Sequence, residues 1–286
     1  MTDQMPAGFY PDMTDAEYFG LPGLHQSSAK YLIPPSTPAH FWAMINSPRK
    51  PSTAFDFGHA AHLKATGRGP EIVLVPFDDY RTKAAQQARD FARAEGRIPL
   101  RAADLQIVED MAGALLAHPA VAEVLTDPSF LAEVSMLCTH PTGPVICGKA
   151  DLISSDLIVD YKTTVTAATA DQFARTVLKY HYDMQAAWYL TITDILGKPR
   201  QGFWFIVQEK NPPYLPALLR LDDEFLEHGY QKMTDALALY SECSDTHTWP
   251  GYPADLQPVH LPAWARTWNP DMTLYTDLEN LLGDLQ

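Results

Sequence analysis

The spacing of apolar residues changes twice along this chain and divides it into three parts. Up to about residue 125, apolar positions recur mostly at helical intervals. Between about residues 126 and 221, most runs are rich in β-branched and apolar residues and are bounded by turn residues, which is typical of strands. The remainder, residues 222–286, begins with an amphipathic pattern and continues into a proline-broken tail.

These patterns predict helices and strands at definite places. The predicted helices cover residues 38–47, the second part of 53–67, 80–96, 102–118, 170–196 and 223–242. The predicted strands cover 71–76, 130–140, 144–155, 157–164, 202–210 and 214–221, with a coil over 249–264. Neither an internal repeat nor a linker interrupts this order. We therefore predict one α/β domain over residues 1–286, with a central mixed β-sheet flanked by helices and an N-terminal helical elaboration.

The strand predicted over residues 157–164 carries two charged residues, Asp160 and Lys162, in an otherwise apolar run. Residues two apart on a strand face the same side, so both side chains project together while Tyr161 points away. Asp151 lies on the preceding strand, and a tight turn between antiparallel neighbours would bring it close to Asp160. Two carboxylates at one point repel each other unless a cation lies between them, and oxygen ligands suit Mg²⁺ or Mn²⁺.

Lys162 would lie within reach of the same point, where it could orient a water molecule or stabilise a charged phosphoryl oxygen. A metal, a water molecule and a lysine together make a site for phosphodiester hydrolysis. The alternative is a simple ion pair between Asp160 and Lys162 at the end of a strand.

The charge of the chain, −14 overall, is unusual for a protein that binds DNA. Most of it lies in residues 222–286, which hold 12 acidic and 2 basic residues, whereas residues 1–221 carry a net charge of only −4. Arg89 and Arg93 belong to an acid-poor stretch of the first half and can share one face of a helix, which Gly96 then ends. They are candidate DNA contacts, although such charge runs are more often solvated faces.

Three cysteines, Cys138, Cys147 and Cys243, are too few and too scattered for a disulfide framework, and their spacing fits no zinc motif. The first residues contain no basic and apolar leader, and no run approaches the roughly 18 apolar residues of a membrane span. We therefore expect a cytoplasmic protein with no membrane contact.

A signature runs through the charged strands: Asp151, then eight residues, then Asp160-Tyr161-Lys162. It resembles the PD-(D/E)xK nuclease signature, with aspartate at the second acidic position. Residues 58–62 resemble the GxxxH helix of RecB-type and RecE-type exonucleases, with His62 as its histidine.

Two further features fit the same families. Glu133 matches their extra acidic residue, and Gln185 and Tyr189, four apart on one helix face, resemble their QxxxY helix. Other segments resemble RecE-like phage exonucleases (exonuclease VIII), so the resemblance covers nearly the whole chain: they are residues 27–33, 38–45, 110–119, 203–229 and 249–264.

The resemblance implies a role for each of these positions. His62, Asp151 and Asp160 would hold a divalent metal together with the backbone carbonyl of Tyr161, and Glu133 would be a ligand directly or through water. Lys162 would help to activate the attacking water. The cofactor would be Mg²⁺, with Mn²⁺ as a substitute. Gln185 and Tyr189 would shape the site or touch DNA, although a tyrosine on an apolar helix is more often part of the core.

Exonucleases of the RecE type digest one strand of linear double-stranded DNA from its 5′ end and serve phage-type homologous recombination. The resemblance therefore implies double-stranded DNA ends, a single-strand annealing protein and further copies of this chain, in a ring-like oligomer, as partners. Two alternatives stay open: a RecB-like repair nuclease acting on single strands or flaps, and a non-catalytic DNA-binding recombination partner.

Overall fold

The protein is described by a computed structural model over residues 5–47 and 51–262. It divides into two compact units, residues 1–250 and 251–286. In the second unit, residues 251–262 form no helix or strand and are exposed, as the proline-rich sequence predicts. Residues 263 and 264 of the predicted coil lie outside the described residues. All the elements below belong to the first unit.

Helices dominate the first half of this unit, as predicted. In chain order the elements are β1 (Gly8–Tyr10), α1 (Asp15–Phe19), β2 (Leu24–His25), α2 (Gln26–Ala29), α3 (Pro38–Ile45), α4 (Thr53–Thr66), β3 (Ile72–Leu74), α5 (Lys83–Ala94), β4 (Ile98–Leu100), α6 (Ala102–Ala117) and α7 (Pro119–Thr126). The sequence did not predict the strands β1, β2 and β4. Each has three residues or fewer, which is too short to show an alternating pattern.

The second half supplies most of the sheet. Its elements are β5 (Leu131–Thr139), β6 (Val145–Ile153), β7 (Leu157–Thr164), α8 (Ala170–Tyr180), α9 (Tyr182–Ile195), β8 (Gly202–Glu209), β9 (Pro216–Arg220) and α10 (Asp223–Thr246). The sheet order is β1-β5-β6-β7-β8-β9, with β2 beside β6. Strands β7 and β8 are parallel and joined by α8 and α9, β2 runs parallel to β6, and the remaining pairs of this sheet are antiparallel. Strands β3 and β4 form a separate parallel pair. The predicted fold, a central mixed sheet flanked by helices, is confirmed.

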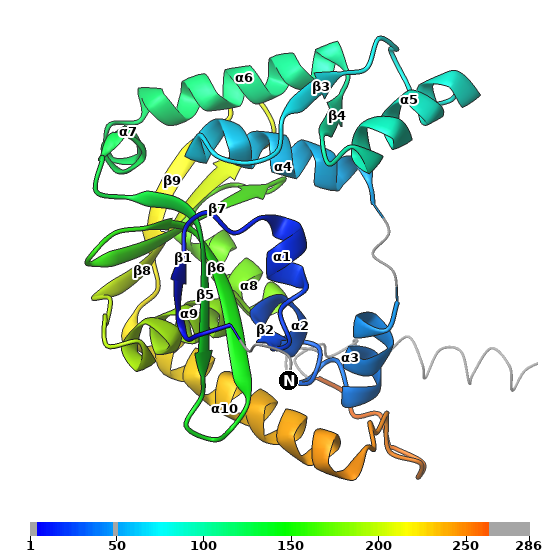
Figure 1. The fold of residues 1–286 in the computed structure, drawn as a ribbon, viewed down its shortest axis with the longest axis vertical. Coiled ribbons are helices and arrows are strands. Elements are labelled where there is room, and N and C mark those ends of the chain that lie inside the picture. The colour runs from blue at the N-terminus through cyan, green and yellow to red at the C-terminus, as the bar shows by residue number, and fades with distance from the viewer. Residues whose placement is uncertain (1–4, 48–50, 263–286) are drawn as a thin grey trace, which may run out of the picture. The chain divides into compact units, whose positions relative to one another are not determined.

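Helices cover both faces of this sheet (Figure 1). One core cluster joins sheet residues to α9 and α10 and includes the fully buried Trp188. A second cluster joins the other face to α4, α6 and α7, through residues such as Ala61 and Met111. Strand β6 contributes to both clusters: Ala150 belongs to the first and Leu152 to the second. Asp151 lies between these two residues in the strand.

The helix predicted over residues 170–196 is wrong in one respect, because the structure divides it into α8 and α9. His181 separates them with φ 59° and ψ 42°, a left-handed conformation that a continuous helix does not contain. By contrast, α5 ends as predicted before Gly96, whose φ is 69°. Within the described residues, none of the helices has both the length and the apolarity needed to cross a membrane.

Candidate active site

Helix α4 positions His62 over the sheet. The hydroxyl of Ser52 caps its N-terminus by accepting a hydrogen bond from the amide of Phe55. Gly67 ends it in a left-handed conformation, φ 72°, which glycine adopts without strain. Between these ends, Ala61 and Ala65 pack into the second core, and His62 projects toward strands β5 and β6.

Glu133 and Asp151 lie opposite each other on β5 and β6, and the ladder of paired positions continues on both sides of them. At this point Glu133 has φ 58°, which is rare for a residue other than glycine. Both carboxylates reach the same imidazole. His62 Nδ1 lies 3.1 Å from Glu133 Oε1, and His62 Nε2 lies 3.0 Å from Asp151 Oδ2.

Asp160 is the next residue in register opposite Asp151 on the other side of β6, where the pairing of β6 with β7 has just ended. The separation of the strands there lets Asp151 Oδ2 accept a hydrogen bond from the amide of Tyr161, at 2.8 Å. Asp160 itself is 1% exposed. Its Oδ1 accepts a hydrogen bond from Gln185 Nε2 at 2.6 Å, and its Oδ2 is in ion-pair contact with the ammonium of Lys162.

The charges in this cluster shift one another's protonation. Burial alone would lower the pKa of His62, but Asp151 and Glu133 outweigh it and raise that pKa to about 9. Burial likewise favours the neutral form of Asp151, yet His62 holds its pKa below the ordinary value. Burial, and next the charge of Asp151, raise the pKa of Asp160 to about 6. Lys162 is buried, which disfavours its charge, but Asp160 raises its pKa above the ordinary value, so it stays protonated.

The residue between the two motif positions, Tyr161, faces the opposite core, as the strand period predicts. Its hydroxyl donates to Gln208 Oε1 at 2.6 Å. Gln208 is fully buried on β8, and its amide nitrogen donates to the carbonyls of Met111 and Tyr214. This network fixes β7 relative to α6, and sequence reasoning missed it because its members lie far apart in the chain.

Gln185 and Tyr189, the QxxxY pair, lie on α9 at different distances from the carboxylates. Gln185 contacts Asp160 directly, as described above. Tyr189 is buried and packs against the backbone of β6, where a Cβ added to Gly148 would meet its ring at 2.9 Å. The contacts of Tyr189 are therefore those of a core residue that supports the strand carrying Asp151.

The two arginines proposed as DNA contacts already have partners. Arg93 binds the buried carboxylate of Asp56 with two nitrogens and also contacts Asp90. Arg89 donates to Asp90 and lies 5.2 Å from the ring centroid of Tyr80. A role in DNA binding stays a prediction for both, and it would require these ion pairs to be shared or broken.

Lys149 is a member of the site that the sequence analysis did not select. Its ammonium lies 2.5 Å from Glu133 Oε2 and 2.5 Å from Asp15 Oδ1, so it links β5 to the start of α1. The signal was present in the sequence, because Lys149 precedes Asp151 by two residues on the same strand and therefore faces the same side.

His62, Glu133 and Asp151 offer three ligand atoms that all lie within 4.8 Å of one another, one nitrogen and two carboxylate oxygens. This donor set suits a divalent cation. Protonated His62 directs one ring nitrogen to each carboxylate, and a bound cation would balance the same two negative charges. The residues therefore fit a metal. Asp160 is outside this group of three, and its role as a direct ligand, like that of the Tyr161 carbonyl, stays a prediction.

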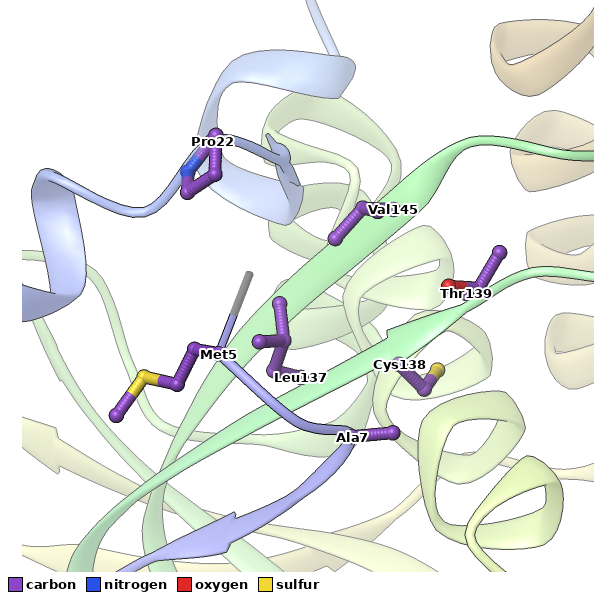
Figure 2. A pocket seen from close by; sticks show the side chains of 7 residues that line it. All are labelled: Met5, Ala7, Pro22, Leu137, Cys138, Thr139 and Val145. Carbon is purple, nitrogen blue, oxygen red and sulfur yellow. The ribbon is translucent and has the colours of Figure 1, made fainter. Parts of the chain in front are cut away.

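A small cavity of about 50 Å³ lies elsewhere on the unit (Figure 2). It is lined mainly by apolar side chains from the N-terminal segment and strands β5 and β6: Met5, Ala7, Pro22, Leu137, Cys138, Thr139 and Val145. Burial raises the pKa of the Cys138 thiol to about 11, so the thiol stays protonated and inert. The cavity shares no residue with the carboxylate cluster and offers no comparable chemistry.

Known families and solved structures include proteins that are similar to this chain. Residues 27–258 match the family described as "PDDEXK-like domain of unknown function (DUF3799)". A search of curated proteins finds no match. Among solved structures, the 2.19 Å crystal structure of an inferred exonuclease from Eubacterium rectale is similar in fold, with a TM-score of 0.60 and 13% sequence identity over 91% of this chain and 99% of that chain.

Two further structures are only remotely similar. SSO0001 covers 65% of this chain and 86% of its own, at 16% identity and a TM-score of 0.27. LHK-Exo in complex with dAMP covers 68% of this chain and 94% of its own, at 17% identity and a TM-score of 0.26. With TM-scores this low, neither structure supports a conclusion about the fold or the function of this chain.

Proposed function

The chain belongs to the PDDEXK-like family DUF3799, and on this premise we propose that it is a metal-dependent nuclease that hydrolyses phosphodiester bonds of DNA. The observation that carries the proposal is the convergence of His62, Glu133 and Asp151 beside the Asp160–Lys162 pair. A divalent cation held by these residues would supply the positive charge that stabilises the transition state of phosphodiester hydrolysis.

Lys162 has a defined part in this proposal. Because its pKa is raised, it stays an ammonium and cannot act as the base that removes a proton from water. It can instead donate hydrogen bonds to a phosphoryl oxygen or orient a water molecule. Gln185 holds one oxygen of Asp160, which leaves the other directed at Lys162 and fixes where that ammonium lies.

The finer proposal is a RecE-like exonuclease that uses Mg²⁺, or Mn²⁺ in its place, to digest linear double-stranded DNA from the 5′ end in phage-type recombination. The order of the motif residues along the chain supports it. The proposed partners are double-stranded DNA ends, a single-strand annealing protein and other copies of this chain, in the cytoplasm. Light scattering during gel filtration, with and without DNA, tests the oligomer.

A comparison of substrates tests the activity. The wild-type protein is incubated with linear duplex, nicked circular duplex and single-stranded DNA in Mg²⁺, in Mn²⁺ and in EDTA, and the linear duplex is labelled at either the 5′ or the 3′ end. Metal-dependent loss of the 5′ label from linear duplex supports the proposal. Degradation restricted to single-stranded DNA favours the RecB-like alternative. DNA binding without cleavage under any condition favours the non-catalytic alternative and overturns the nuclease.

The variant Lys162→Ala tests the role of the lysine in cleavage. It should abolish cleavage, because the ammonium beside the scissile phosphate is lost, while metal-dependent binding of DNA persists. Binding is measured by fluorescence anisotropy in Ca²⁺. Full activity of Lys162→Ala on linear duplex would exclude the proposed role of this lysine.

A further inference from the structure

The junction between α8 and α9 has an unusual geometry that the catalytic proposal does not use. Here Tyr180 ends α8, His181 is left-handed, and Tyr182 begins α9. In a continuous helix, residues two apart do not face each other. The left-handed residue reverses this relation: the rings of Tyr180 and Tyr182 stack, with centroids 5.7 Å apart and planes 28° apart. We call this pair the tyrosine stack.

In this conformation the amide of His181 caps α8 by donating a hydrogen bond to the carbonyl of Val177. A residue other than glycine is strained in the left-handed region. The side chain is 7% exposed, and its Nδ1 is buried without a hydrogen-bond partner among the described residues. Strained residues that a fold retains are concentrated at functional sites. The strain points to a use for the arrangement it creates, which is the tyrosine stack.

One end of the tyrosine stack is held at the candidate active site. The ammonium of Lys162 lies 4.7 Å from the ring centroid of Tyr182. Core residues also contact Tyr182: its ring centroid lies 5.9 Å from that of Phe205 and 6.1 Å from that of Phe173. Tyr182 is therefore a rigid support for the ring of Tyr180, which stacks on it.

The other end of the tyrosine stack reaches solvent. Tyr180 is 44% exposed, and the ammonium of Lys179 lies 5.1 Å from its ring centroid. An exposed aromatic ring beside a flexible cation is the combination with which proteins bind unpaired nucleotides: the ring stacks on a base and the cation contacts the backbone.

We propose that Tyr180 stacks on an unpaired nucleobase next to the phosphate that lies at Lys162. The inference rests on the proposed nuclease function and specifies its substrate: a DNA strand that is single-stranded, or locally separated from its complement, where it enters the site. Within a duplex both faces of an internal base are covered by its neighbours, so the stack requires an unstacked nucleotide.

A double-mutant cycle tests this inference. Single-stranded oligonucleotides carry 2-aminopurine at one position each, and quenching of its fluorescence identifies the base that stacks. An abasic nucleotide is then placed at that position. Affinities are measured by anisotropy in Ca²⁺, and gel analysis verifies that the oligonucleotide stays intact. Wild-type protein should lose about 5- to 150-fold in affinity on removal of that base.

The variants separate stacking from general damage. Tyr180→Leu removes the ring and should weaken binding by the same factor, with no further loss on the abasic strand. Tyr180→Phe keeps the ring and should behave as wild type. Leu178→Ala, an exposed neighbour on α8, controls for effects on the helix end. Thermal unfolding of each variant establishes that the fold is intact.

The outcomes distinguish this inference from the proposed function. Additive losses from Tyr180→Leu and the abasic nucleotide, or no loss from either, overturn the stacking inference. Cleavage by wild-type protein measured in parallel then decides whether the nuclease proposal stands without it. Coupling between Tyr180 and the base in a protein that does not cleave would support the stack as a binding site and overturn the nuclease.

Discussion

At the scale of single residues, Glu133 shows that the candidate site depends on a backbone conformation its sequence does not favour. Its φ of 58° would suit glycine, yet the position holds a glutamate whose two carboxylate oxygens contact His62 and Lys149. The contacts hold the carboxylate in place, and the backbone is strained as a result.

Substitution at Glu133 can separate the contribution of the carboxylate contacts from the cost of the backbone strain. Glu133→Gly and Glu133→Ala both remove the carboxylate, but only alanine retains the strain of the left-handed backbone. We expect Glu133→Gly to be more stable than Glu133→Ala by about 1 kcal/mol. Urea denaturation in EDTA measures the difference. Both variants should bind Mn²⁺ more weakly than wild type in calorimetry, and equal stability of the two would contradict the strain.

The pKa of His62 predicts how the metal-free protein responds to pH. Its value of about 9 in the folded state exceeds the ordinary 6.5, so the folded state binds the proton more tightly than the unfolded state. The resulting stabilisation is fully present below about pH 6.5 and is lost as the pH rises to about 9. We expect the free energy of unfolding in EDTA to fall more steeply across this window in wild type than in His62→Gln. Urea denaturation across the window measures both slopes, and identical slopes would contradict the prediction.

At the scale of elements, α9 and α10 approach each other so closely that only glycine fits at the crossing. A Cβ added to Gly229 on α10 would lie 2.2 Å from the carbonyl oxygen of Asp183. The same region holds the buried carboxylate of Asp183, which contacts His228 and Lys232 on α10. The helix that supplies Gln185 is thus fixed by backbone contact and by charge.

A pair of glycine substitutions tests this crossing. Gly229→Ala should destabilise the protein by at least about 3 kcal/mol, because two helix backbones must separate to admit the methyl group. Gly113→Ala on α6 is the control: its Cβ would meet no atom within 4 Å, and we expect it to stabilise by about 0.5–1 kcal/mol. Urea denaturation measures both. A tolerated Gly229→Ala would contradict the close approach.

At the scale of the whole molecule, the first unit is completed by residues just after α10. The ring of Trp249 stacks on Trp42 at a centroid distance of 4.9 Å and on Phe41 at 5.2 Å, and the carbonyl of Pro250 accepts a hydrogen bond from the amide of Ala39. These contacts tie the end of the first unit to α3, near its beginning.

Two truncated chains test where the first unit ends. A chain ending at Pro250 retains these contacts and should unfold at the same temperature as the full chain. A chain ending at His247 lacks Trp249 and should be less stable by on the order of 2 kcal/mol, since a partly buried aromatic side chain is lost. Thermal and urea denaturation compare the three chains. A large loss in the Pro250 chain would assign a structural role to the residues beyond it.

Much of this arrangement is local and was therefore accessible from the sequence. Gly67 and Gly96 end helices because only glycine adopts positive φ freely. This preference comes from the missing Cβ and does not depend on distant contacts. The alternation on β7 separates Asp160 and Lys162 from Tyr161 because the strand period is two. The turn after Asp151 predicts an antiparallel neighbour, and the structure pairs Leu152 with Val159 and Ile153 with Ile158.

Other features depend on contacts between distant segments, which no local pattern contains. The sequence predicts one helix over residues 170–196, but the helix breaks at His181, and Tyr182 beyond the break packs against Phe205 and Lys162. Lys149 and Gln208 acquire their roles from partners more than ten residues away, Asp15 and Tyr161. The sequence by itself determined which side chains could share a metal. Only the tertiary structure decided how close they come, because that depends on how α4 packs across the sheet.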